Sequence, residues 1–432
     1  MKQGYLLAAG FSYQFGMPLV KDLTEVFFSI FDKEYITIVA DGLAQKFPYG
    51  PNYPLNRDAL FRALEIITTA KENKEENYEQ IINRIKELER STHQPDLSRS
   101  YSYIFSVCYE IIHNILVDYQ KVTFHLYQIK KEPYKQFRNL ISQDAETWVF
   151  TLNHDLFMEF IAKDFGIPIT FGDKYEINFR KDNKKFFNTI IPFTYSEKND
   201  VNKDNPLFFR ENFGINLVKL HGGLNELKYK DGSNLCNLTL DVKDSSELME
   251  NFKNMMDMRH YLPNGEVPKS AEDWVITNMD NELDIATKSM LTGGDKYSIS
   301  FSEKDGEEKL ILFSKKIEEI ELLSIIGYGF NDRHINNKIY KALLLNPSLK
   351  LKIVNPYAEY PECLLEFKES IYLIRSDVAN WIYFEEHSTP TNHCWNEDLQ
   401  PYNAEIEKLR PLIKSVVLNL TGLKYRPPSM SN

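Results

Sequence analysis

Three polar side chains that could carry out chemistry follow two short apolar runs of the sequence. Asn153 and Asp155 come after residues 148–151, which read Trp-Val-Phe-Thr, and His221 comes after residues 217–220, which read Leu-Val-Lys-Leu. An imidazole has an unperturbed pKa of about 6.5 and can therefore accept and return a proton near neutral pH. An amide and a carboxylate beside it could orient a substrate or stabilise developing positive charge. These residue types would suit general acid–base chemistry, although a histidine such as His221, taken alone, is more often a core or loop residue than a catalyst.

A turn of small residues follows the first apolar run of the chain. Residues 6–12 read Leu-Leu-Ala-Ala-Gly-Phe-Ser, and Gly-Met-Pro follows at residues 16–18. In α/β proteins such a turn lets the pyrophosphate of a dinucleotide approach a helix N-terminus, where free N–H groups and the helix dipole favour anions. Taken alone, the turn could equally have a purely structural role at the end of a strand.

Further apolar runs predict the strands that would bring these residues together. Residues 322–326 precede the stretch Gly-Tyr-Gly-Phe-Asn-Asp at 327–332, residues 351–354 precede Asn355, and residues 371–374 form another candidate strand. Parallel strands place their carboxyl ends along one edge of a sheet, where ligands of open α/β sheets bind. The sequence thus predicts an α/β fold in which four strand ends face a single crevice.

Two long segments interrupt the predicted sheet. Amphipathic helical patterns fill residues 33–145, which we interpret as a helical insertion domain. A second insertion, about 225–302, is expected to hold a hairpin near 227–240 and helices around 245–290, and the polar residues 174–211 are expected to be irregular. The sheet domain would consist of residues 1–32 and 146–432, with helices over 23–31, 333–345 and 396–418.

Composition narrows the classes of protein to consider. The chain has 432 residues, a net charge of −11 and 43% hydrophobic residues, which is typical of a globular protein without the basic excess of a nucleic-acid binder. No apolar run reaches the roughly 18 residues of a membrane span, and the run at residues 5–9 is shorter than a signal peptide. Direct nucleic-acid binding is therefore unexpected, and we expect a cytoplasmic protein with no membrane contact.

The four cysteines do not form a metal-binding pattern. They lie far apart and include no Cys-x-x-Cys pair, which argues against a zinc ribbon and against a disulfide framework; they are Cys108, Cys236, Cys363 and Cys394. His393 beside Cys394, with His387 nearby, lacks further ligands, so we interpret it as a surface cluster. No bound metal is expected.

The order of the motifs resembles the sirtuin family. That family has Gly-Ala-Gly-x-Ser followed by Gly-Ile-Pro, then Thr-x-Asn-x-Asp, then a histidine before a glycine. Here residues 8–12 read Ala-Ala-Gly-Phe-Ser, residues 151–155 read Thr-Leu-Asn-His-Asp, and His221 precedes Gly222. The stretch at 327–335 is similar in particular to bacterial sirtuin-like proteins of antiphage defence. The likeness covers the core strands, and the two insertions lie outside it.

The resemblance implies a Rossmann-like, sirtuin-like sheet that binds NAD as substrate and breaks its nicotinamide–ribose bond. Asn153 would then hold the nicotinamide ribose and its water, and His221 would be the general base. Asp155 would complete the catalytic set, either by orienting the pocket or by binding the nicotinamide side. The residues that would bind the cofactor are Ala9, Gly10, Phe11, Ser12, Met17, Pro18, Thr151, Gly327, Gly329, Asp332 and Asn355.

Departures from the family pattern favour water as the acceptor. Sirtuin deacetylases have a four-cysteine zinc module after the histidine, whereas only Cys236 falls in that interval here. Residues 19–21 read Leu-Val-Lys where sirtuins have Asp-Phe-Arg, and a lysine lacks the bidentate fork of arginine. The implied function is an NAD+ hydrolase that releases nicotinamide and ADP-ribose, an effector of abortive infection. By family analogy it would form a homo-oligomer, with a partner ATPase or another defence protein.

Other interpretations remain open at this point. The protein could bind NAD or ADP-ribose as a sensor without turnover, or it could be a protein ADP-ribosyltransferase or deacylase. Asn153 and Asp155 could serve only as turn and cap residues of the helix that follows them, and Asp332 could likewise serve only as the N-cap of the helix at 333–345. His334 is expected to be structural.

Overall fold

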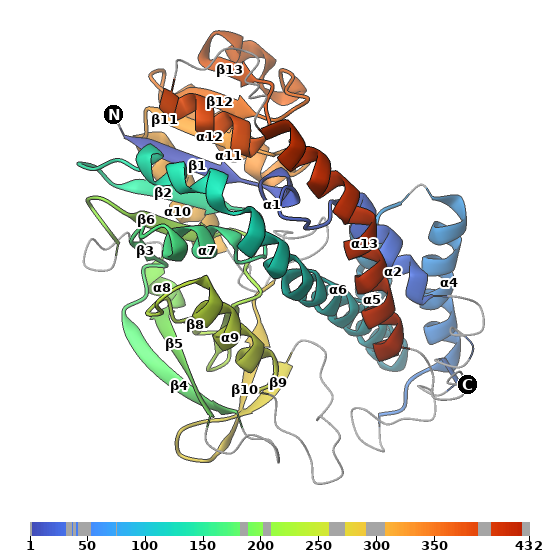
Figure 1. Cartoon of the computed structure of the whole chain (residues 1–432). Helices are drawn as coiled ribbons and strands as arrows, with labels where there is room; N and C mark the ends of the chain where they lie inside the picture. Colours follow the sequence, from blue (N-terminus) through green and yellow to red (C-terminus); the bar gives the residue numbers. More distant parts are fainter. Residues whose placement is uncertain are drawn as a thin grey trace.

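A seven-stranded parallel sheet forms the upper left part of the molecule in Figure 1. The structure is a computed structural model that describes residues 2–31, 37, 40–41, 53–74, 76–181, 189–201, 209–258, 273–290, 307–387 and 399–425. In spatial order the strands are β13 (Ile371–Ile374), β12 (Lys350–Val354), β11 (Leu322–Ile326), β1 (Gln3–Leu7), β2 (Thr147–Thr151), β6 (Ile215–Lys219) and β3 (Ile169–Thr170). This confirms the predicted α/β class, and the sheet is compatible with a Rossmann-like fold.

Helices cover both faces of the sheet, which is why its strands are nearly continuous apolar runs. Successive side chains of a strand point to opposite faces. Leu6 therefore packs with α10 and α11, and Leu7 packs with α7 and α12 on the other face. The covering elements are α1 (Ala9–Tyr13), η1 (Glu132–Leu140), α7 (Phe157–Asp164), α8 (Lys198–Val201), α10 (Glu307–Glu319), α11 (Arg333–Leu345), η2 (Glu362–Ser370) and α12 (Val378–His387).

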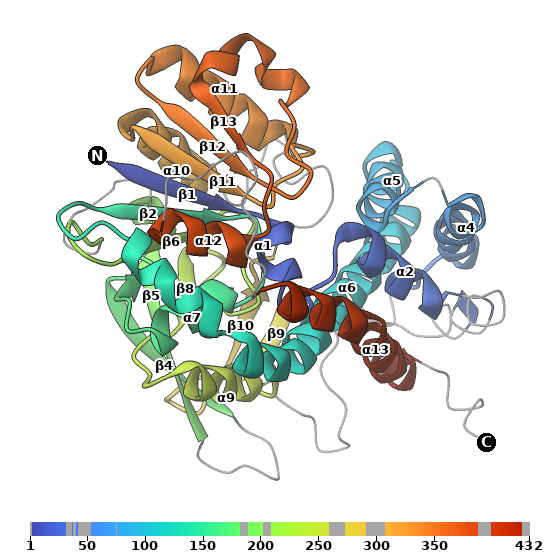
Figure 2. The ribbon, with the colours of Figure 1, turned by 45° about the horizontal axis from the view of Figure 1, so that its top comes forward.

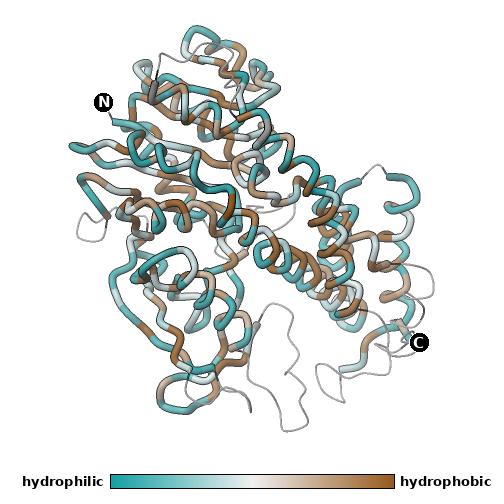
Figure 3. Tube along the Cα trace, in the orientation of Figure 1, coloured by the Kyte–Doolittle hydropathy of each residue, from teal (hydrophilic) through white to brown (hydrophobic). Residues whose placement is uncertain are grey.

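A helical unit stands beside the sheet, at the right of Figure 1. It contains α2 (Val20–Ile30), α4 (Arg57–Asn73), α5 (Tyr78–Ser91), the long α6 (Pro95–Lys130) and the C-terminal α13 (Gln400–Tyr425). Figure 2 shows α13 alongside α6, and a hydrogen bond of 2.5 Å joins Asn114 to the Tyr425 hydroxyl. Hydrophobic residues run along α6 (Figure 3), which is buried between its neighbours. The unit thus adds α2 and α13 to the helices expected within residues 33–145.

A closed six-stranded antiparallel barrel lies on the other side of α6 and was not expected from the sequence. Its strands are β4 (Tyr175–Lys181), β5 (Thr189–Glu197), β7 (Glu226–Tyr229), β8 (Asn234–Leu238), β9 (Asp273–Thr277) and β10 (Leu283–Lys288), with α9 (Ser245–Met256) beside them.

The barrel corrects two expectations and confirms a third. The prediction that 174–211 is irregular was wrong, because β4 and β5 lie there; their alternating polar positions face outward, as Asn178 does beside the buried Phe179. The prediction of helices around 245–290 was wrong at residues 273–288, because β9 and β10 pair there as a hairpin around the buried Trp274 and Ala286, and residues 259–272 lie outside the described part of the chain. The hairpin near 227–240 is confirmed by β7 and β8.

The chain reverses its direction of travel across the sheet between β1 and β11. From β1 the chain proceeds to β2 on one side, whereas from β11 it proceeds to β12 and β13 on the other. Such a switch point opens a crevice beyond the carboxyl ends of the two strands. Two glycines form its base: the Gly10 N–H donates to the Gly327 oxygen at 3.0 Å, and a Cβ on Gly10 would lie 2.6 Å from the Gly327 Cα.

Gly327→Ala tests this backbone contact against a matched glycine. Gly327 has φ +67°, and a Cβ there would lie 2.5 Å from the Gly10 Cα; Gly232, in the β7–β8 turn, has φ +79° with nothing within 4 Å. Gly232→Ala should cost about 1–2 kcal/mol of unfolding free energy, from the left-handed conformation alone. Gly327→Ala should cost about 3 kcal/mol more, because neither backbone can yield. Urea denaturation measures both, and equal losses would contradict the close contact.

Candidate functional site

A pocket of about 650 Å³ opens at the carboxyl ends of β1, β2, β6 and β11, at the switch point. Ten of the predicted site residues line it: Ala9, Ser12, Met17, Pro18, Asn153, Asp155, His221, Gly327, Gly329 and Asp332. The four polar strand ends therefore meet in one place, as the sequence predicted. The volume lies within the range of small-molecule sites.

A chain of hydrogen bonds joins the first two motifs. The Asn153 amide nitrogen donates to the Ala8 carbonyl at 3.0 Å and to the Ser12 hydroxyl at 2.9 Å, and the Ser12 side chain in turn hydrogen-bonds the Asp155 carboxyl. A carbonyl oxygen can only accept, so the atom facing Ala8 is the amide nitrogen. Both amide hydrogens are thereby used, and the oxygen is the end of Asn153 that a ligand could meet.

Asp155 is a buried acid at the floor of the pocket. Burial raises the pKa of its carboxyl above the ordinary value, while the hydrogen bond from Ser12 and the positive charge of Lys219 act to lower it. The same carboxyl accepts the N–H of Phe157 at 3.1 Å and so starts α7. Asp155 therefore does form the turn before α7, as one of the two interpretations predicted, and it also lines the pocket.

A fully buried ion pair supports the pocket from below. Lys219 and Glu159 lie 2.7 Å apart, each with 1% of its side chain exposed, and the Lys219 ammonium also donates to the Asp155 carbonyl at 2.6 Å and to Asn225 at 2.8 Å. Sequence reasoning missed this pair. A lysine inside the apolar run at 217–220 was the available signal, because a buried cation requires a partner.

The third and fourth motifs meet through a histidine and a carboxylate. His221 Nε2 lies 3.1 Å from Asp332 Oδ2, and the two side chains are 3% and 15% exposed. The other oxygen of Asp332 accepts the N–H groups of His334 and Ile335 and caps α11. The cap interpretation of Asp332 is thus confirmed, together with a contact to the predicted general base.

Other residues of the pocket were not predicted. His154 lies beside His221 with ring centroids 6.4 Å apart, and its Nδ1 is 3.1 Å from the Gly222 oxygen. The helical unit contributes Tyr78 and Glu79 from α5 and Leu116 from α6. Only the packing of α5 and α6 against the sheet brings these three residues to the strand ends, and no local sequence signal indicates them.

Four predicted residues do not line the pocket. Gly10 lies beneath it against Gly327, and Phe11 is 1% exposed, its ring packed against Phe15 and Tyr134. The Thr151 hydroxyl accepts the Asn153 N–H at 3.0 Å, and the Asn355 side chain accepts the Tyr357 N–H at 2.9 Å in the turn after β12. Those last two contacts stabilise the backbone beyond their strands.

The described part of the chain contains no group of three or more His, Cys, Asp or Glu residues placed to hold a metal. Cys236 is buried in β8 inside the barrel, and Cys108 is buried in α6. His393 and Cys394 lie outside the described residues, as does the side chain of His387. None of the helices traced in the structure has the length and hydrophobicity of a membrane span.

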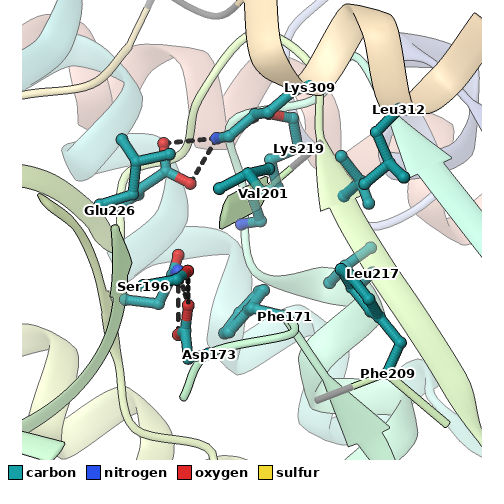
Figure 4. A pocket seen from close by; sticks show the side chains of 13 residues that line it. Phe171, Asp173, Ser196, Val201, Phe209, Leu217, Lys219, Glu226, Lys309 and Leu312 are labelled. Carbon is teal, nitrogen blue, oxygen red and sulfur yellow. Dashed lines mark hydrogen bonds and ion pairs between the residues drawn. The ribbon is translucent and has the colours of Figure 1, made fainter. Parts of the chain in front are cut away.

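A second, far smaller cavity lies between the sheet and the barrel (Figure 4). It has about 20 Å³ of space, enough for one water molecule. Lys309 forms a buried ion pair with Glu226 on one wall, and opposite them Asp173 accepts hydrogen bonds from Ser196 and Thr194. Burial raises the pKa of Asp173 to about 6. This cavity is too small for a substrate, and the larger pocket is the candidate site.

Comparison with the models of known protein families and with curated protein sequences finds no match to this chain.

Ser12→Ala tests the hydrogen-bond chain through its dependence on pH. Burial raises the pKa of Asp155 in the folded state, so the free energy of unfolding falls as the pH rises above the unfolded-state pKa of about 3.9. Loss of the Ser12 hydrogen bond should raise the folded-state pKa further. We expect a loss of about 1–3 kcal/mol at pH 7 that shrinks as the pH falls below the folded-state pKa of Asp155, where the carboxyl is protonated in the folded form of both proteins. Urea denaturation at several pH values measures it.

Ser29→Ala is the matched control. The Ser29 hydroxyl bonds only the Val26 carbonyl of its own helix, at an exposed position. Its loss should be below about 0.5 kcal/mol and independent of pH. A Ser12→Ala effect that also stays constant with pH would mean that Ser12 does not stabilise the Asp155 carboxylate.

Proposed function

We propose that this protein is a sirtuin-like NAD+ hydrolase that releases nicotinamide and ADP-ribose. The observation that carries the proposal is the meeting of four sequence motifs in one pocket: Ser12, Asn153 with Asp155, His221, and Asp332. The pocket lies at the switch point of a parallel sheet, where dinucleotides bind in α/β proteins. The resemblance to sirtuins rests on the same residues.

The reaction breaks the bond between the nicotinamide nitrogen and ribose C1′, and its transition state carries positive charge on the ribose. Asn153 presents its amide oxygen, because its nitrogen is held by Ala8 and Ser12. That oxygen can accept a hydrogen bond from water or a ribose hydroxyl, and in the proposed mechanism it would lie near the developing charge. Water forms the new bond to C1′, and His221 takes its proton.

Charged and backbone groups at the rim suit the rest of a dinucleotide. Arg333 is an exposed cation at the start of α11, beside Gly329 in the pocket wall. A guanidinium binds phosphate oxygens through two parallel hydrogen bonds. In a chain with a net charge of −11, such a local cation would favour the approach of an anionic substrate.

The biological setting follows the same resemblance. The protein would act in the cytoplasm as an effector of antiphage abortive infection that depletes NAD when triggered. It would work as a homo-oligomer, with or without a partner ATPase or another defence protein. Tyr78, Glu79 and Leu116 show that the helical unit forms part of the pocket wall, so a movement of this unit would reach the substrate directly.

Incubation of the purified full chain with NAD+ tests the proposal. Nicotinamide release, followed by chromatography, should fall by at least about 100-fold in His221→Ala and in Asn153→Ala, because general-base catalysis contributes about 10²–10⁴-fold. His93→Ala is the control, since His93 is exposed and outside the pocket. A native mass measurement on the same samples gives the oligomeric state to which each rate applies.

Three results would replace the hydrolase with another function. Tight NAD+ binding without nicotinamide release, in the monomer and in the assembled state, would identify a sensor. Nicotinamide release with ADP-ribose attached to protein would identify a transferase, and removal of acyl groups from lysine would identify a deacylase. Unchanged rates in both pocket variants would remove His221 and Asn153 from the mechanism.

A further inference from the structure

We propose that Ser289 is a positioning residue for His221, and that it acts from a short segment, residues 288–290, which is anchored on α6 of the helical unit. The proposal rests on the function proposed above, because it concerns the placement of the proposed general base. Ser289 does not line the pocket itself. The observation is that three consecutive residues at the end of β10 contact, in turn, α6, the residues that follow His221, and α6 again.

Ser289 contacts the residues that follow His221. Its hydroxyl donates to the Glu226 carbonyl at 3.2 Å and accepts the Gly223 N–H at 3.4 Å, and the residue is buried. Gly222 has φ +70°, and a Cβ there would lie 2.3 Å from the Ser289 carbonyl oxygen. The two backbones are therefore in contact, and a glycine is needed at this point. Ser289 thus holds residues 221–223 from the side of the barrel.

Hydrogen bonds on the side of the sheet hold the same residues. The Gly222 N–H donates to the Lys219 carbonyl of β6 at 3.1 Å, and the Leu224 N–H donates to the His154 carbonyl at 2.8 Å. Residues 221–223 therefore lie between the strand ends of the sheet and the end of β10. Loss of the contacts on the barrel side would leave this stretch attached to the sheet alone.

The two neighbours of Ser289 contact α6. The Met290 carbonyl accepts the Tyr109 hydroxyl at 2.7 Å, and both residues are buried. The Lys288 ammonium forms an ion pair with the Glu110 carboxylate, and the Lys288 side chain is 2% exposed. A buried cation requires a partner, so this ion pair fixes Lys288 against the helix. Both ends of the 288–290 segment are consequently bound to α6.

The 288–290 segment links the position of α6 to that of His221. A shift of α6 would act on Tyr109 and Glu110, and through them on the segment that contacts Gly222 and Gly223. A misplacement of about 1 Å caused by a change far from the reacting atoms can cost about 100-fold in rate. We therefore expect a disturbed segment to lower kcat. KM should stay constant, because none of the three residues lines the pocket.

The experiment removes one hydroxyl at each end of this link. Tyr109→Phe takes the hydrogen bond from the Met290 carbonyl, and Ser289→Ala takes both bonds of the Ser289 hydroxyl. Tyr127→Phe is the matched control, because Tyr127 is also buried on α6 but its hydroxyl donates to Asp164, at 2.9 Å, outside the pocket. Hydrogen–deuterium exchange of the full chains, followed by mass spectrometry, reports on residues 220–226. The same samples give kcat and KM for nicotinamide release and the melting temperature.

We expect faster exchange at residues 221–224 and a kcat lower by about 10-fold in Tyr109→Phe and in Ser289→Ala, with KM within about twofold of the wild type. The double variant should lose no more than the larger single loss, because both hydroxyls act through one segment. Tyr127→Phe should keep the exchange and kcat of the wild type.

Four results would overturn the proposal: unchanged exchange at residues 221–224 in both variants, an unchanged kcat, a rise in KM in place of the loss in kcat, or an equal loss of kcat in Tyr127→Phe. Exchange is measured without substrate and does not depend on the activity. If exchange rises as expected while the wild type releases no nicotinamide in any oligomeric state, the link from α6 to residues 221–223 stands and the hydrolase is overturned.

Discussion

The structure depends on one close approach of two backbones, that of Gly10 and Gly327. The hydrogen bonds of the sheet continue past the strand ends at this point: the Ala8 N–H bonds the Ile326 oxygen, and the Gly10 N–H bonds the Gly327 oxygen. At these glycines the segment after β1 turns into α1, and the segment after β11 turns toward α11 on the opposite face of the sheet. In the same way, the Leu152 N–H donates to the Leu7 oxygen of β1, and the Leu220 N–H donates to the Thr151 oxygen of β2. Asn153 and His221 are thus placed by backbone geometry, before any side-chain contact forms.

The buried charges beneath the pocket and at the junction with the barrel are matched in pairs. Lys219 with Glu159 and Lys309 with Glu226 are ion pairs in which every side chain is less than a tenth exposed. Removing one partner of such a pair leaves an uncompensated buried charge, which costs about 3–5 kcal/mol. The Lys309 ammonium also donates to the Lys219 carbonyl and so links the two pairs across the junction with the barrel. The site therefore rests on a rigid base shared by the sheet and the barrel.

Much of the sheet could be predicted from the sequence, whereas of the barrel only the β7–β8 hairpin was predicted. The strands at 322–326 and 371–374 and the helix at 333–345 have the predicted bounds, because strands buried on both faces are plain apolar runs. Barrel strands alternate polar and apolar residues, and they come from two segments on either side of β6, so their pairing is long-range. Within the site, the positions of the strand ends were enough to predict that Asn153, His221 and Asp332 meet. The contacts of Tyr78, Glu79 and Lys219 depend on how whole elements pack, which no local pattern records.

Asp332 and Asp155 also show why a structural and a functional interpretation of one residue are not alternatives. A carboxylate has two oxygens, and a helix N-terminus uses one of them to satisfy its free N–H groups. The helix then holds the second oxygen in a fixed direction at no further cost in conformational entropy, since the rotamer is already set. Asp332 directs that oxygen at His221, and Asp155 forms the turn before α7 by accepting the Phe157 N–H while it also bonds Ser12. Where a helix starts at a strand end, its cap is consequently a preorganised part of the pocket wall.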